Sequence, residues 1–118
     1  MTLKDIYQFF QNPPVWYLNQ ELATCFVLNT LLKEDSYGTE LVQLVERNYP
    51  PYRLSDTILY NALKFLLKEG LIRGYSKKVD GRGRPRQMYQ IFPEKKAKAE
   101  ELAHLWQEYV NRNGTAIA

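Results

Sequence analysis

Cysteine and histidine are almost absent from this sequence, which holds one of each, Cys25 and His104, among its 118 residues. A disulfide needs two cysteines, and a structural zinc site takes about four ligands that are mostly cysteine and histidine. A hydrolase would also need a base beside its nucleophile, and the sequence suggests no such cluster. We therefore expect no metal site, no cofactor and no enzymatic activity.

Long apolar runs are also missing. No segment approaches the roughly 18 uninterrupted apolar residues of a membrane-spanning helix. Lys4 and Asp5 lie in the first turn, which does not fit a secretory signal. The sequence thus predicts a cytoplasmic protein that does not bind membranes. Cys25 lies in an apolar helical run and is expected to be a small core residue.

Positive charge is concentrated in one segment, although the net charge is only +3. Residues 1–67 hold five basic and seven acidic side chains, residues 68–98 hold ten and three, and residues 99–118 hold one and three. A basic segment within a mildly acidic chain is typical of a protein that binds nucleic acid through one surface.

Three core helices are predicted before or beside this basic segment. Residues 19–33 are apolar on almost every side, so we expect this helix to be buried on several faces, partly by a second chain. A second helix begins after Ser36 and ends near Asn48. A third begins after Ser55, buries a leucine-rich stripe and ends at Gly70. Its exposed polar face suits base edges or phosphates in a major groove, with an ordinary solvated face as the alternative.

A β-hairpin follows the third helix. Two short strands, 71–79 and 87–92, flank the stretch Asp80-Gly81-Arg82-Gly83-Arg84-Pro85-Arg86, in which arginine alternates with glycine and proline. Such a stretch suits contact with phosphate or base edges, and a solvated flexible turn is the alternative. The Gly83-Arg84-Pro85 part resembles the core of AT-hook motifs, so Arg84 is the candidate for insertion into a narrow minor groove. The order of elements predicts a mainly α protein with a small β-hairpin, a winged helix-turn-helix.

Two segments flank the winged helix-turn-helix domain, which we place at 19–92. The N-terminal arm, 1–18, holds five aromatic residues, too much apolar area to leave in water, so it covers either its own domain or a partner subunit. A last helix, 93–113, has an apolar stripe with no evident place in the small core, and residues 114–118 are expected to be a disordered tail. A homodimer explains both segments. The candidate interface residues are Leu3, Ile6, Tyr7, Phe10, Phe26, Leu102, Leu105, Trp106 and Tyr109.

Several motifs resemble the PadR family of bacterial transcriptional regulators over about residues 22 to 92. They are Tyr37-Gly38, Leu59-Tyr60-Asn61-Ala62-Leu63, Glu69-Gly70-Leu71-Ile72 and Gly83-Arg84-Pro85-Arg86. The resemblance implies a dimeric winged-helix repressor whose C-terminal helix dimerises and whose third helix lies on DNA. The stretch Ile91-Phe92-Pro93-Glu94 departs from the family, which usually has a threonine there to open the next helix. The aromatic arm further resembles a cyanobacterial branch associated with the circadian clock, which implies a clock gene as the target.

Sequence and resemblance together predict a dimer that binds double-stranded DNA at a palindromic promoter operator, with half-sites ~34 Å or more apart. The candidate DNA contacts are Ser55, Thr57, Tyr60, Asn61, Lys64, Lys77, Lys78, Arg82, Arg84 and Arg86.

Other functions remain open from the sequence. The domain could have lost DNA binding and serve as a protein-interaction module, with the aromatic arm recruiting a partner. It could also be a ligand-responsive sensor, because many relatives bind phenolic acids or hydrophobic drugs between the dimer helices. Trp106 could line such a pocket, although we expect it to fill the dimer core. An RNA-binding protein is disfavoured because no aromatic sheet platform is evident.

Overall fold

The computed structural model describes residues 1–11, 16–79 and 83–112, without the side chains of Phe9 and Phe10. The expected tail, 114–118, and the candidate DNA contact Arg82 lie outside the described residues, as does the side chain of Phe10. None of the helices in the described ranges is both long and apolar enough to cross a membrane.

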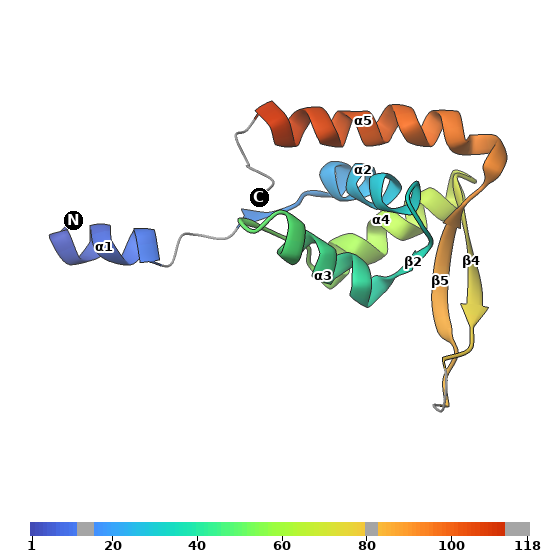
Figure 1. Ribbon diagram of the computed structural model, residues 1–118, viewed down its shortest axis with the longest axis horizontal. Coiled ribbons are helices and arrows are strands. Elements are labelled where there is room, and N and C mark those ends of the chain that lie inside the picture. Colours follow the sequence, from blue (N-terminus) through green and yellow to red (C-terminus); the bar gives the residue numbers. More distant parts are fainter. Residues whose placement is uncertain (12–15, 80–82, 113–118) are drawn as a thin grey trace.

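The elements follow the order expected of a winged helix-turn-helix (Figure 1). They are α1 (Leu3–Gln11), β1 (Trp16–Tyr17), α2 (Gln20–Leu31), β2 (Ser36–Tyr37), α3 (Gly38–Asn48), β3 (Tyr52–Arg53), α4 (Asp56–Lys68), β4 (Ile72–Lys77), β5 (Arg86–Ile91), the short 3-10 helix η1 (Pro93–Lys95) and α5 (Lys96–Arg112). The predicted fold class, mainly α with a small hairpin, is therefore confirmed.

Local capping groups fix the ends of the central helices. The Asn19 side chain accepts a hydrogen bond from the backbone N–H of Leu22 at 2.8 Å and so starts α2. Ser55 caps α4 in the same way, with its hydroxyl accepting from the N–H of Ile58 at 3.2 Å. Gly70, at a φ of 72°, turns the chain out of α4 into the wing, a conformation that glycine adopts without strain.

The core is built around α2, which packs against α4 on one side and α5 on another. Figure 1 shows α5 running along α2 across the top of the molecule. Phe26 of α2 meets Trp106 of α5 at 5.4 Å between ring centroids, with Tyr49 5.1 Å from Trp106. The Gln107 side chain also donates to the buried Asn29 of α2 at 2.7 Å. The same chain thus supplies the cover for α2 that the sequence led us to expect partly from a second chain.

Phe26 and Trp106 therefore differ from their expected place at a dimer interface. Each is only 1% exposed within the protomer. A partner subunit could touch them only if the protomer's own core opened. Three other residues of α5 are likewise buried within this chain, Ala99, Ala103 and Val110, whereas Leu105 on the same helix is exposed.

The wing is a three-stranded antiparallel sheet in the order β2-β5-β4. Tyr37 of β2 pairs with Met88 of β5, and Tyr75 of β4 pairs with Met88 from the other side. Figure 1 shows the β4–β5 hairpin projecting beyond the helices. A separate pair of short parallel strands joins β1 to β3, and Leu18 after β1 is buried. Residues 16–18, which the sequence assigns to the N-terminal arm, therefore pair with and pack on the body.

Candidate nucleic-acid interface

The exposed face of α4 carries the first group of candidate contacts. Leu59, Ala62, Leu63 and Leu66 face the core, so the helical period turns Thr57, Tyr60 and Lys64 to solvent. Tyr60 is 63% exposed, and the Lys64 ammonium lies 5.9 Å from its ring centroid. Asn61 is half-buried beside this face, and Ser55 is partly buried with its hydroxyl engaged in the cap. The face thus offers a phenol, a hydroxyl and a cation at the surface.

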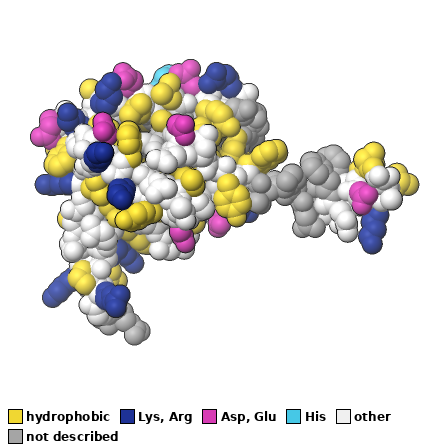
Figure 2. All heavy atoms as spheres, turned by 180° about the vertical axis from the view of Figure 1, so that it is seen from behind, with side chains coloured by type: hydrophobic (Ala, Val, Ile, Leu, Met, Phe, Trp, Pro, Cys, Tyr) yellow, Lys and Arg dark blue, Asp and Glu magenta, His cyan; other side chains and the backbone are white. Residues whose placement is uncertain are grey.

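The wing carries the second group. Lys77 and Arg86 pair across the hairpin, and Lys77, Lys78 and Arg84 are exposed. Figure 2 shows Lys and Arg side chains on the projecting wing, whereas the body above it carries both acidic and basic side chains. The described part of the wing is therefore the basic surface that the charge distribution along the sequence predicts.

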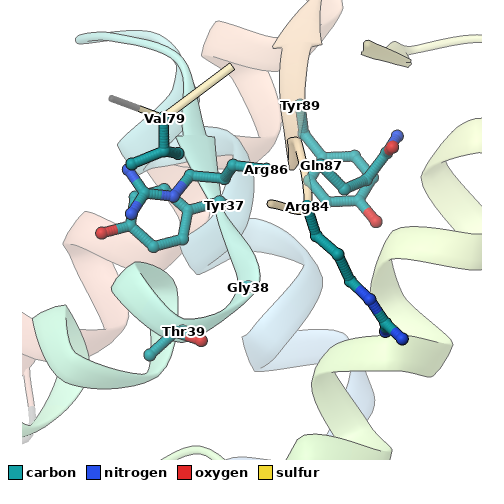
Figure 3. A pocket seen from close by; sticks show the side chains of 8 residues that line it. All are labelled: Tyr37, Gly38, Thr39, Val79, Arg84, Arg86, Gln87 and Tyr89. Carbon is teal, nitrogen blue, oxygen red and sulfur yellow. The ribbon is translucent and has the colours of Figure 1, made fainter. Parts of the chain in front are cut away.

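Arg86 is held against an aromatic ring. Its guanidinium carbon lies 3.9 Å from the centroid of the Tyr37 ring, and Figure 3 shows the two groups stacked while Arg84 points away from them. A guanidinium above an aromatic face is attracted by the negative ring surface and still presents N–H donors at its edge. Tyr37 therefore orients a cation of the wing, a role that the sequence motif Tyr37-Gly38 did not reveal.

Two shallow hollows connect the wing to α4. The first lies between the hairpin and the start of α3, as Figure 3 shows, and is lined by Tyr37, Gly38, Thr39, Val79, Arg84, Arg86, Gln87 and Tyr89. The second lies between α3 and α4, and is lined by Gly38, Thr39, Val42, Gln43, Asp56, Leu59, Tyr60 and Leu63. Because Gly38 and Thr39 belong to both, one concave surface runs from the wing arginines to Tyr60.

This concave surface adds residues to those expected from the sequence. Thr39, Gln43 and Gln87 carry donors that suit phosphate oxygens or base edges. Burial raises the pKa of the Tyr89 phenol, and nearby Tyr60 adds to the effect, so Tyr89 stays neutral. Among the described residues that line this surface, Asp56 is the acidic one. It lies in the first turn of α4, where the positive end of the helix dipole stabilises its negative charge. Polar residues of α3 were missed because only folding brings them beside the wing.

The candidate dimer residues divide into buried and exposed sets. Leu3, Ile6 and Tyr7 are exposed on α1, which stands apart from the body in Figure 1. Leu105 is 53% exposed on α5. Leu102 and Tyr109 are half-buried beside it.

Leu102 and Leu105 line an apolar groove between α2, α4 and α5. The other lining residues are Gln20, Glu21, Thr24, Cys25 and Phe65. Phe65 is 44% exposed and was not among the expected interface residues. Cys25 packs at the edge of the core rather than inside it, and burial raises the pKa of its thiol.

Comparisons with known proteins point to one family. A model described as the transcriptional regulator PadR-like family matches residues 27–101. The crystal structure of the circadian clock associated protein Pex from Anabaena is 57% identical, with a TM-score of 0.83 over 96% of this chain and 98% of that chain. Pex from Synechococcus sp. is also 57% identical, with a TM-score of 0.87 over 93% of this chain and 98% of that chain. A transcriptional regulator from Clostridium thermocellum, 21% identical with a TM-score of 0.60, shares the fold. A search of curated proteins found no significant match.

Proposed function

Because the chain belongs to the PadR-like family of transcriptional regulators, we propose that it binds a palindromic promoter operator as a twofold dimer and represses transcription. The observation that carries this proposal is the concave surface that joins the exposed face of α4 to the basic wing through Gly38 and Thr39. A winged helix places its third core helix in the major groove and its wing on the neighbouring backbone or minor groove.

The roles of the side chains follow from their positions. Thr57, Tyr60 and Asn61 meet the major groove, while Lys64, Lys77 and Lys78 bind phosphates. Arg86, stacked on Tyr37, offers its outer N–H edge to a phosphate, and Arg84 enters the minor groove of A·T-rich DNA. Arg82 has the same chemistry as its neighbours in the sequence and is assigned to phosphate.

Dimerisation uses the apolar surfaces that the protomer leaves exposed. Leu3, Ile6 and Tyr7 of α1, together with the groove that includes Phe65 and Leu105, supply them. An isolated helix of fewer than about 12 residues is marginal in water, so α1 needs a surface to pack on.

Leu105→Glu should shift the protein towards monomer in sedimentation velocity. Leu67→Glu is the matched control. Leu67 is also exposed, but it does not line the groove and lies on a different face of α4 from Phe65, which does.

The target gene is the last part of the proposal. The similarity to two Pex proteins, one of them described as circadian clock associated, supports a clock gene as the regulated promoter. Gel shifts with promoter fragments, including the protein's own, test DNA binding. Genome-wide mapping of bound sites in the native cell then tests the target. A protein that shifts none of these fragments at low salt, and occupies no site in the cell, contradicts the proposal.

A further inference from the structure

Asp35, in the loop between α2 and β2, joins this loop to two strands through its carboxylate. Its Oδ2 atom accepts a hydrogen bond from the Tyr75 hydroxyl of β4 at 2.5 Å and another from the Gln90 amide of β5 at 3.2 Å. Arg73 of β4 in turn donates to the Gln90 side-chain oxygen at 2.7 Å. The bond to Asp35 raises the pKa of the Tyr75 phenol, because ionisation would remove the donated proton and would also place two negative charges together.

The strand register explains why these side chains meet. Arg73 pairs with Gln90, and Tyr75 pairs with Met88, so the four side chains lie on one face of the sheet. Ser36 pairs with Tyr89 on the other side of β5, which places the preceding residue, Asp35, beside Gln90 on that same face. The bond from Tyr75 to Asp35 therefore crosses β5 and links the edge strand β4 to the loop between α2 and β2.

The hairpin needs such a link at its base. In the described part of the chain, β2 pairs with β5 at two residues, Tyr89 and Met88. On the other side of β5, strand β4 has β5 as its one partner in this sheet. The exposed cations Lys77, Lys78 and Arg84 lie beyond this supported part, toward the tip of the hairpin. A small rotation at the base becomes a larger displacement at the tip, whereas a binding group must be held within about 0.5 Å of its productive position.

We propose that Asp35 is a positioning residue for DNA binding, which fixes the angle of the wing relative to α4 by holding Tyr75 and Gln90. The inference rests on the proposed function, because it takes DNA as the ligand of the wing. It also predicts that removal of this acidic side chain weakens DNA binding, which is the opposite of the usual effect of removing a negative charge. An acidic side chain beside a basic wing should repel DNA, so its removal would tighten binding if Asp35 were only a surface charge.

The first test uses the free protein. Hydrogen exchange of the β4 amides should be about fivefold faster in Asp35→Asn and in Tyr75→Phe than in the wild type, because each change weakens the link. Tyr75→Phe removes only the hydroxyl and leaves the charge unchanged. Equal exchange in all three proteins would overturn the inference. This readout needs no DNA, so it tests the link even if the proposed function fails.

The second test measures affinity for an operator fragment. Asp35→Asn and Tyr75→Phe should each weaken binding about fivefold, and the double variant should be no weaker than either single one, because both break the same link. Glu101→Gln is the matched control for charge, since Glu101 lies on α5 and pairs with exposed Lys98. Tighter binding by Asp35→Asn, equal to that of Glu101→Gln, would show that Asp35 acts only through its charge. A wild-type protein that binds no DNA would instead contradict the proposed function.

Discussion

Arg84 is exposed on the wing and points away from the stacked pair of Arg86 and Tyr37. It is free to enter a narrow minor groove, where the negative potential of A·T-rich DNA is enhanced. We expect Arg84→Ala to weaken operator binding by about 1–3 kcal/mol and to relax preference for A·T pairs beside the half-site. Titrations with operators that carry A·T or G·C flanks would measure both effects. Unchanged affinity on both operators would assign the wing tip no part in recognition.

Tyr37 should act through Arg86 rather than through DNA directly. Its ring lies 3.9 Å from the guanidinium carbon, and such contacts contribute about 0.5–2 kcal/mol. Tyr37→Leu removes the aromatic face, and we expect operator binding to weaken about threefold to tenfold. Tyr37→Phe keeps the ring, loses only the hydroxyl and should bind like the wild type. If Phe were as harmful as Leu, the hydroxyl rather than the ring face would be the functional group.

At the residue scale, the sequence shows which cations and polar side chains are candidates for function, but it does not show which side chains they contact in the fold. Arg84 and Lys78 are evident from composition alone, because few cores accommodate such residues. The contact between Arg86 and Tyr37 depends on the register of β2 against β5, which joins residues far apart in the chain. The same holds for Asp35 and Tyr75, which are 40 positions apart. Local periodicity carries no information about such pairs.

At the scale of elements, the pairing of α5 with α2 decides how the apolar stripe of the last helix is used. The sequence correctly indicates that both helices need cover, because α2 is apolar on several sides and α5 on one. It does not distinguish cover by the same chain from cover by a partner, since the hydrophobic effect is not directional. The partly buried hydrogen bond between Gln107 and Asn29 helps to fix the register of this pair.

Trp106→Ala tests this assignment. Trp106 is 1% exposed and lies against Phe26 and Tyr49, so the change should leave a large cavity in the protomer. Phe or Trp to Ala changes in cores cost about 3–5 kcal/mol of unfolding free energy. We expect a lower midpoint in urea, with a loss of stability that does not depend on protein concentration. A residue that only joined subunits would instead give a loss that depends on concentration.

At the scale of the whole molecule, the dependence of DNA affinity on salt can count the subunits on the operator. If about six of the dimer's candidate phosphate contacts, three from each protomer, neutralise phosphates at once, the slope of log affinity against log salt should be near −5, from roughly −0.9 per contact. Lys78 is exposed on the wing and is one of the proposed phosphate contacts, so Lys78→Gln should remove one contact from each protomer. A bound dimer should therefore lose about two contacts and a bound monomer about one.

Lys98→Gln provides the control for that measurement. Lys98 is exposed on α5 and pairs with Glu101 at 2.8 Å, on an element distinct from the wing and α4. Its removal changes the net charge by the same amount without removing a phosphate contact, so the slope should stay near that of the wild type. A slope reduced by one unit in Lys78→Gln would contradict binding by a twofold dimer. Equal slopes in all three proteins would mean that Lys78 does not contact phosphate, and the wing would then lie on DNA through Lys77 and its arginines.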